Sequence, residues 1–84
     1  MIQTILIVED EIKLANILSD YLIKEGYKTE IIEDGIEVIP WVKKHNPSLL
    51  LLDLMLPNIN GKEICKEIRT FSKVPIIMVT AMID

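Results

Sequence analysis

The segment Leu49-Leu50-Leu51-Leu52-Asp53 decides how the rest of this chain is interpreted. Four consecutive leucines show no alternation of apolar and polar residues, which is typical of a strand buried on both faces of a parallel sheet. Asn46-Pro47 interrupts any preceding helix, and Asp53 ends the apolar run with a charge. We therefore predict a central strand over Leu49–Leu52 that ends in a carboxylate.

Three further segments favour strands. Ile5–Val8 is short, apolar and followed directly by acids, so it is a second candidate for a buried strand. Tyr27–Ile32 alternates polar with apolar or β-branched residues and stops at Asp34-Gly35, which indicates a half-exposed strand near a sheet edge. Val74–Val79 supplies a fourth predicted strand.

Helical patterns lie between these strands. Apolar residues recur at helical spacing in the first of them, at Leu14, Leu18, Tyr21 and Leu22. We predict a helix over residues 11–25, closed by Gly26 in a left-handed conformation. A second helix is predicted over Ile36–Lys44, where Pro40 lacks a backbone N–H and is tolerated only in an early turn or at a kink.

A third helix is predicted to open at Asn60-Gly61, with Ile64, Cys65 and Ile68 on its apolar side. Strands that alternate with helices at this spacing predict an α/β fold, with right-handed crossovers, a parallel sheet and helices on both faces. Ligands of such sheets gather outside the carboxyl ends of the strands. The residues at those ends therefore decide the function.

Composition narrows the class of protein. The chain has 84 residues, of which 50% are hydrophobic, so it has room for one small domain and is not intrinsically disordered. Its net charge of −4 argues against a nucleic-acid surface within these residues. A single cysteine, Cys65, excludes an internal disulfide. With no secretory signal pattern and no long apolar run, we expect a cytoplasmic protein without a membrane partner.

Three acids follow the two strands predicted to be buried. Glu9 and Asp10 come after Ile5–Val8, and Asp53 comes after Leu49–Leu52, so all three can share one pocket. Crowded carboxylates disfavour ionisation unless a cation relieves them, and hard oxygen ligands without His or Cys suit Mg²⁺. Such an ion would attract a phosphoryl group, for which Asp53 is a candidate nucleophile and the Thr80 hydroxyl a hydrogen-bond donor. Any one of these acids alone is more readily explained as a solvated loop residue, and it is their joint occurrence that indicates a site.

Four segments carry a resemblance to a known family: residues 5–11 (ILIVEDE), 51–57 (LLDLMLP), 60–61 (NG) and 74–81 (VPIIMVTA). Together they resemble the receiver domains of two-component response regulators, most of all those attached to winged-helix DNA-binding domains. The resemblance implies a flavodoxin-like fold with strand order 2-1-3-4 over about four strands and three helices.

The resemblance also implies a role for each site residue. Asp53 would be the phosphoacceptor, Asp10 a direct Mg²⁺ ligand, and Glu9 an acid that acts mainly through a coordinated water. The backbone carbonyl of Met55 would complete the protein ligands of the metal. Thr80 would be the switch hydroxyl that moves toward the phosphoryl group.

The sequence departs from the family pattern at its end. Receivers carry a lysine at the end of a fifth strand, and this sequence stops at Asp84 before such a strand. The resemblance thus implies that residues 1–84 are the N-terminal part of a receiver domain, with no second domain. An edge over Val74–Val79 would then be open to pairing, so we expect these residues either to be unstable alone or to form a homodimer, through the fourth strand or by exchange of elements. Pro57 and Gly61 would shape the loop beside the site.

The sequence therefore predicts a phosphoacceptor module that takes a phosphoryl group from a sensor histidine kinase onto Asp53 with Mg²⁺. It would be a signalling domain that assists its own phosphorylation, and not an enzyme in the ordinary sense. The alternative is a truncated interaction or assembly module that keeps the acidic pocket but does not switch.

Rival classes fit less well. A phosphate-binding NTPase needs G-x-x-x-x-G-K-S/T, which Gly61-Lys62-Glu63 does not supply. Phosphohydrolases of the haloacid dehalogenase type carry a D-x-D motif at the nucleophile, but the second residue after Asp53 is Met55. A dinucleotide site needs glycines where Glu9-Asp10-Glu11 stands. We interpret His45 as a helix-terminal residue in preference to a phosphorelay histidine, and Cys65 as a core residue in preference to a redox thiol.

Overall fold

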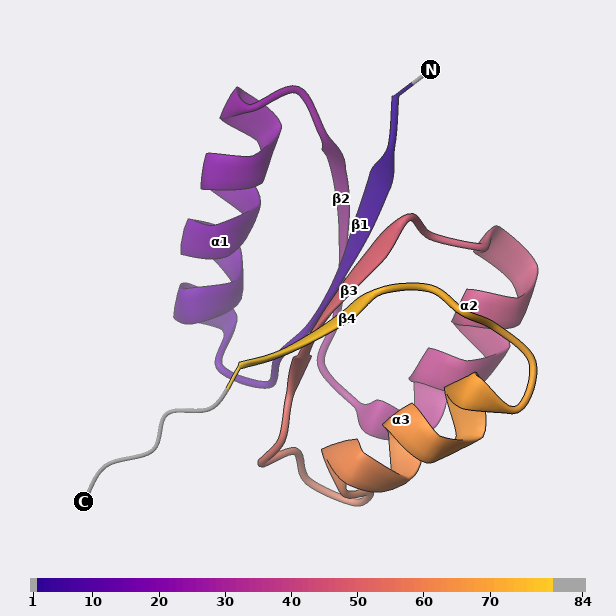
Figure 1. Cartoon of the computed structure of the whole chain (residues 1–84). Helices are drawn as coiled ribbons and strands as arrows, with labels where there is room; N and C mark the ends of the chain where they lie inside the picture. Colours follow the sequence, from indigo (N-terminus) through magenta and orange to yellow (C-terminus); the bar gives the residue numbers. More distant parts are fainter. Residues whose placement is uncertain (1, 80–84) are drawn as a thin grey trace.

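The computed structural model describes residues 2–79, which form a four-stranded parallel sheet and three α-helices. The sheet order is β2-β1-β3-β4, as the resemblance implied (Figure 1). The elements in chain order are β1 (Thr4–Val8), α1 (Ile12–Lys24), β2 (Lys28–Ile32), the 3₁₀ turn η1 (Gly35–Glu37), α2 (Val38–His45), β3 (Leu49–Asp53), α3 (Gly61–Arg69) and β4 (Ile76–Val79).

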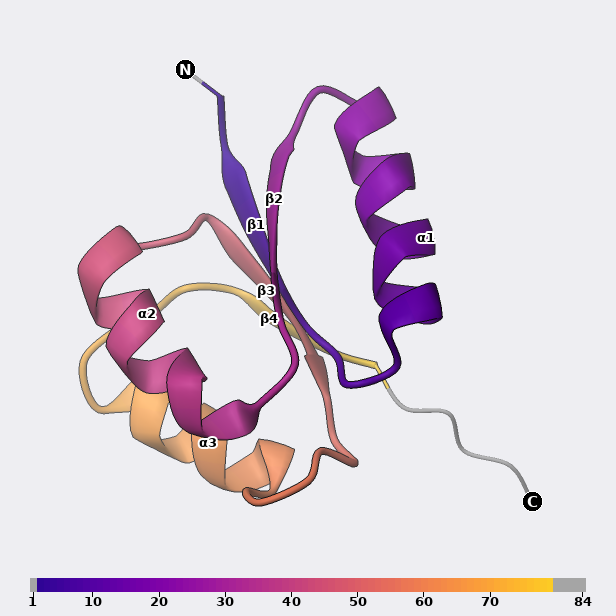
Figure 2. The ribbon, with the colours of Figure 1, turned by 180° about the vertical axis from the view of Figure 1, so that it is seen from behind.

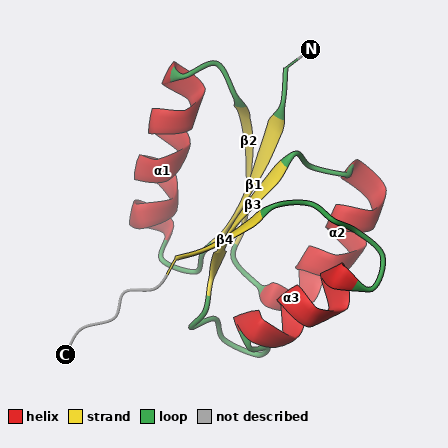
Figure 3. Ribbon diagram, viewed as in Figure 1, coloured by secondary structure: helices red, strands yellow, loops and turns green. Residues whose placement is uncertain are grey.

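Helices cover both faces of the sheet. The views from the two sides show α1 on one face and α2 with α3 on the other (Figures 1 and 2). Coloured by secondary structure, β1, β2 and β3 are each followed by a helix that returns the chain to the start of the next parallel strand (Figure 3). The predicted α/β class and layer arrangement are therefore confirmed.

The core lies mainly between the two interior strands and the α2–α3 layer. Leu6 of β1 and the β3 residues Leu50 and Leu52 are fully buried, as are Ile64 and Ile68 of α3. Burying a side chain of this size contributes about 1.5–3 kcal/mol relative to leaving it in water. The alternate leucines of β3 are half-buried, so this strand is buried more completely on its α2–α3 face than on its α1 face.

The segment predicted as the second helix begins as a 3₁₀ turn. The α-helix itself starts at Val38, which places Pro40 in its first turn. A backbone N–H in the first turn has no partner within the helix, so proline costs nothing there. This confirms the expectation that Pro40 is tolerated by an early-turn position.

The prediction that Tyr21 belongs to the apolar stripe of α1 was wrong. Tyr21 is 70% exposed, whereas the buried residues of α1 are Ala15 and Ser19. The apolar stripe is centred on these two small residues, which let the helix approach the sheet, and Tyr21 lies outside it. The hydroxyls of Ser19 and Thr29 are 2.6 Å apart, so the buried polar group is hydrogen-bonded to β2.

The outer strands of the described sheet differ from the inner ones. β2 alternates exposed with less exposed residues, as predicted for an edge strand. β4 is shorter than predicted because Pro75 cannot donate to the ladder, although its carbonyl accepts from the Leu50 N–H at 3.0 Å. Ile77 and Met78 of β4 are exposed. Across residues 2–79, none of the helices has both the length and the apolar character that a membrane span requires.

Candidate functional site

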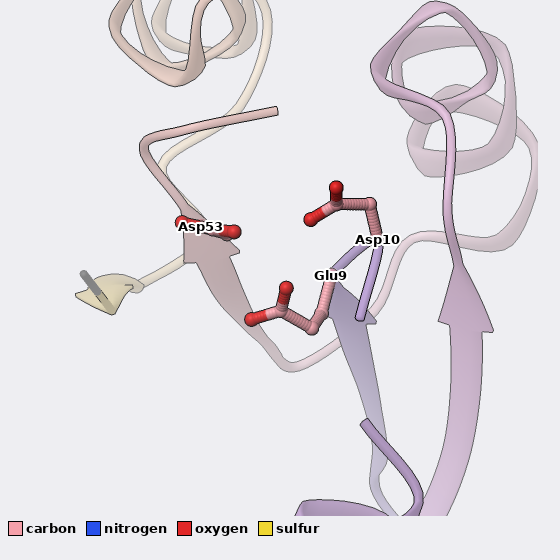
Figure 4. A group of neighbouring side chains, drawn as sticks. All are labelled: Glu9, Asp10 and Asp53. Atoms are coloured by element: carbon pink, nitrogen blue, oxygen red, sulfur yellow. The ribbon is translucent and has the colours of Figure 1, made fainter. Parts of the chain in front are cut away.

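The carboxyl ends of β1 and β3 bring three carboxylates together. The two strands are parallel neighbours, with Val8 opposite Leu52, so they end at the same level. Glu9 and Asp10 follow β1, and Asp53 is the last residue of β3. Figure 4 shows the three side chains directed toward a common space beyond the strand ends.

The cluster is compact and partly buried. Glu9, Asp10 and Asp53 each place a carboxylate oxygen within 4.8 Å of the others. Glu9 is 5% exposed and Asp53 is 9% exposed, whereas Asp10 is exposed. The hollow over the cluster contains no basic side chain among the described residues that line it: Glu9, Asp10, Glu11, Leu14, Asp53, Met55 and Val79. Within residues 2–79, the acids therefore face one another without a cationic side chain in the hollow to balance them.

Backbone groups orient the two buried acids. The N–H of Glu11 donates to Oε2 of Glu9 at 3.1 Å, and the N–H of Met55 donates to Oδ1 of Asp53 at 3.0 Å. In both cases a carboxylate accepts a hydrogen bond from the backbone N–H two residues later, which closes a short turn. These hydrogen bonds fix the carboxylates at the strand ends before any ligand arrives.

Crowding and burial alter the acidity of the site. The pKa of Glu9 is raised from 4.5 to about 7, chiefly by burial and also by the neighbouring Asp53 carboxylate, against the opposing effect of the Glu11 N–H. The charged form of Glu9 is disfavoured because the site offers little solvent and a like charge at close range. At neutral pH the metal-free cluster therefore tends to hold a proton.

The donor set suits a hard divalent cation. All three side chains offer carboxylate oxygens, and the described residues that line the hollow include no histidine or cysteine. Oxygen-only ligands of this kind favour Mg²⁺ or a similar ion over zinc or copper. Such an ion would also counter the burial and the like charge of Asp53 that together raise the pKa of Glu9.

The loop after Asp53 closes the site from one side. A Cβ at Gly61 would lie 2.7 Å from the carbonyl oxygen of Asp53 and 2.9 Å from Cα of Leu54. The start of α3 therefore rests directly on the backbone that carries Asp53, and only glycine permits this approach. The side chain of Asn60 caps the helix by accepting from the Lys62 N–H at 2.7 Å.

Most of the predicted site residues gather here. Glu9, Asp10 and Asp53 form the cluster, and Met55 lines the same hollow with its side chain exposed. Thr80 lies outside the described residues. The sequence pattern placed Leu14 only in the apolar stripe of the first helix, although its position near the start of α1, just after the acids of β1, is a signal that could have assigned it to the hollow.

A parallel α/β domain with an acidic hollow at its strand ends is the class that the fold and the site define. The family model for the response regulator receiver domain matches residues 5–84. The chain belongs to the response regulator receiver domain family.

Individual relatives agree with this assignment. The chain is 52% identical over 80 residues to the transcriptional regulatory protein BaeR of Escherichia coli O6:H1, covering 95% of the chain and 33% of BaeR. It is 45% identical over 84 residues to the DNA-binding response regulator MtrA of Mycobacterium tuberculosis strain H37Rv, covering 100% of the chain and 37% of MtrA. The chain thus spans about a third of the length of these curated relatives.

Among solved structures, the chain is similar to the response regulator TrrA of Thermotoga maritima, described in complex with Mg²⁺ and BeF. The TM-score is 0.90 and the sequence identity 35%, over 96% of this chain and 71% of TrrA. This similarity supports the flavodoxin-like fold that the resemblance implied.

Proposed function

We propose that this chain is the phosphoacceptor part of a response regulator, and that Asp53 receives a phosphoryl group from the phosphohistidine of a sensor histidine kinase. The observation that carries the proposal is the cluster of three carboxylates, two of them buried, in a hollow without a basic side chain among the described residues. Receiver domains are signalling modules that sensor histidine kinases phosphorylate, and the proposal assigns this role to the cluster.

The proposed transfer uses one of the two carboxylate oxygens of Asp53. Its Oδ1 accepts a hydrogen bond from the Met55 N–H, so Oδ2 is the oxygen proposed to attack phosphorus. The new O–P bond forms as the P–N bond of the phosphohistidine breaks, and the imidazole nitrogen leaves with the electron pair. The product is an aspartyl phosphate, a labile acyl linkage of the kind that carboxylate nucleophiles form.

Mg²⁺ is the proposed cofactor. Asp10, Asp53 and the backbone carbonyl of Met55 would hold it, and Glu9 would act mainly through a coordinated water. When bound, the ion neutralises charge on the phosphoryl oxygens during transfer. The complex of TrrA with Mg²⁺ and BeF supports this choice of ion for a relative of the same fold. Thr80 is proposed to donate its hydroxyl to a phosphoryl oxygen.

Residues 1–84 are proposed to act as the input part of a longer signalling system. BaeR and MtrA are named as transcriptional and DNA-binding regulators, and this chain matches about a third of each. With a net charge of −4, these residues are proposed to receive the signal and not to contact nucleic acid themselves. The proposed location is the cytoplasm, where a kinase and its regulator meet.

The test is the formation of a phosphoryl adduct. The chain is incubated with a small acyl-phosphate donor, with and without Mg²⁺, and its intact mass is measured. One added phosphoryl group is expected with Mg²⁺ and none with Asp53→Asn. Asp20→Asn is the matched control, because it removes one carboxylate from the exposed side of α1 and should leave the adduct unchanged. A wild-type chain that acquires no adduct would overturn the proposal.

The exposed edge of β4 favours a second candidate function. Among the described residues β4 pairs only with β3, and Ile77 and Met78 are 52% and 39% exposed. Apolar edge strands offer unpaired backbone groups that a second strand can extend. An assembly module that pairs through β4 without switching would give no phosphoryl adduct, so the same mass measurement separates the two functions.

A further inference from the structure

The loop between β3 and α3, residues 54–60, carries Met55 and is attached to the rest of the domain at two places. Its base is closed by Gly61, which contacts the backbone of Asp53 and Leu54. The N–H of Gly61 also donates to the carbonyl of Leu54 at 3.4 Å. This anchor fixes where the loop begins and ends, but it does not fix the conformation of the residues between.

The second anchor lies at the tip of the loop. Asn58 has a φ of +71°, a left-handed conformation that asparagine tolerates better than most residues. Its Nδ2 donates to Oδ2 of Asp34 at 3.2 Å. The next residue, Ile59, packs on Gly35, where a Cβ would overlap the Cγ2 atom of Ile59. The loop tip therefore docks on the connection between β2 and α2.

Asp34 is itself held in place on that connection. Its Oδ1 accepts from the N–H of Ile36 at 3.0 Å and so caps the turn η1. Its carbonyl accepts from the N–H of Glu37 at 3.0 Å. One carboxylate oxygen of Asp34 is thus bound to the backbone and the other to Asn58. Asp34 therefore anchors the loop of residues 54–60 at a place outside the acidic cluster.

We propose that Asp34 and Asn58 are positioning residues for the cation site, because their hydrogen bond holds the loop that presents the Met55 carbonyl. This inference rests on the proposed function, in which that carbonyl is a ligand of Mg²⁺. The hydrogen bond is exposed and adds little to the stability of the fold. Its effect is instead on how accurately one ligand is placed, since groups that orient metal ligands alter affinity without touching the ion.

The first variant is Asn58→Asp, which keeps the shape of the side chain but sets two carboxylates against each other. We expect the affinity of the chain for Mg²⁺, measured by isothermal titration calorimetry, to fall about three- to tenfold, at or below the low end of the range for such orienting groups. Charge alone predicts the opposite result, because an added negative charge attracts a cation. The direction of the change therefore separates positioning from simple electrostatics.

Exchanging the partners is the sharper test. The double variant Asp34→Asn with Asn58→Asp restores an amide facing a carboxylate, and we expect its Mg²⁺ affinity to return to within about twofold of the wild type. Asn46→Asp is the matched control, since Asn46 is also exposed, also has a positive φ of 50°, and lies at the end of α2. Its Mg²⁺ affinity should match that of the wild type.

Urea unfolding without Mg²⁺ shows whether each variant folds. If Asn58→Asp does not fold, Asn58→Gly takes its place, because glycine removes the amide and suits the positive φ; the same loss of affinity is expected. The positioning role of Asp34 and Asn58 would be overturned if the folded position-58 variant bound Mg²⁺ as tightly as the wild type or more tightly, or if the double variant did not recover the affinity. Either result would leave the proposed function standing. A wild-type chain that does not bind Mg²⁺ would overturn the proposed function as well.

Discussion

The two ends of the sheet are built from the same strands but differ in how they accommodate charge. At the amino end, a hollow is lined by side chains of both signs together with aromatic and hydroxyl groups, namely Thr4, Lys28, Glu30, Trp41 and His45. At the carboxyl end, the ionisable groups that line the hollow in the described part of the chain are all acids, and Glu9 and Asp53 are less than 10% exposed.

This difference separates structural from functional surface. Charges of both signs in contact with solvent change the free energy of folding little, so the charges at the amino end do not indicate a functional site. Buried like charges are unfavourable, and the fold tolerates them at the carboxyl end although the pKa of Glu9 is raised as a result. Unfavourable electrostatics retained at one end of a sheet are typical of a site that awaits a ligand.

Two glycines provide the comparison with the largest expected effect. Gly61→Ala would place a Cβ 2.7 Å from a backbone oxygen at the carboxyl end, where no flexible side chain can move aside. We expect the free energy of unfolding to fall by about 2–4 kcal/mol. At the amino end, Gly26 has a φ of +95° with nothing within 4 Å, so Gly26→Ala should cost roughly 1 kcal/mol through its backbone conformation alone. Urea unfolding measures both, and equal losses would contradict the view that the carboxyl end is the more tightly closed.

The pH dependence of stability is the next prediction in size. The pKa of Glu9 is about 7 in the folded chain against an ordinary 4.5, so the folded state binds this proton more tightly than the unfolded state. In metal-free buffer this group therefore lowers stability as the pH rises from about 4.5 to about 7, and the loss should total about 1–3 kcal/mol.

The comparison of variants assigns this slope to one residue. Glu9→Gln should flatten the dependence between about pH 4.5 and about pH 7, whereas the exposed Glu30→Gln at the amino end should leave it as in the wild type. Urea unfolding at several pH values provides the measurement. The same slope in Glu9→Gln as in the wild type would show that the buried acids at the strand ends do not act as described.

Much of this arrangement was predictable from the sequence because it follows from strand geometry. An apolar run that ends in an acid places that acid at a sheet edge, and two such runs in parallel place their acids side by side, which is why the clustering of Glu9, Asp10 and Asp53 was foreseen. Asn60 before Gly61 likewise carried a local signal for the start of α3.

Other features depend on contacts that no periodic pattern encodes. Asp34 and Asn58 are 24 residues apart in loops, and only the folded chain shows that they meet. Tyr21 matched the helical spacing, yet Ala15 and Ser19 define the buried stripe because small residues allow the closest approach to β2. The burial of Glu9 but not of the adjacent Asp10 also required the structure, since both acids directly follow the same strand.

The smallest effect is expected at the amino end, where His45 provides a test of the contrast between the two ends. His45 ends α2, its ring stacks on Trp41 with centroids 4.4 Å apart, and its Nδ1 lies 3.3 Å from the Trp41 carbonyl oxygen. These contacts favour the helix-terminal role over a phosphorelay role. His45→Gln should therefore lower the free energy of unfolding by no more than about 0.5 kcal/mol.

The same variant should acquire the phosphoryl adduct as fully as the wild type, with the emission of Trp41 recording the loss of the stacked ring. The reason is distance as well as chemistry: β1, which joins the two ends, has five residues and so separates them by about 13 Å. A phosphoryl group on Asp53 has no contact across that length with the His45 ring. Loss of the adduct in His45→Gln, with the fold intact, would mean that the amino end takes part in the chemistry and that the difference in charge between the two ends does not mark where function lies.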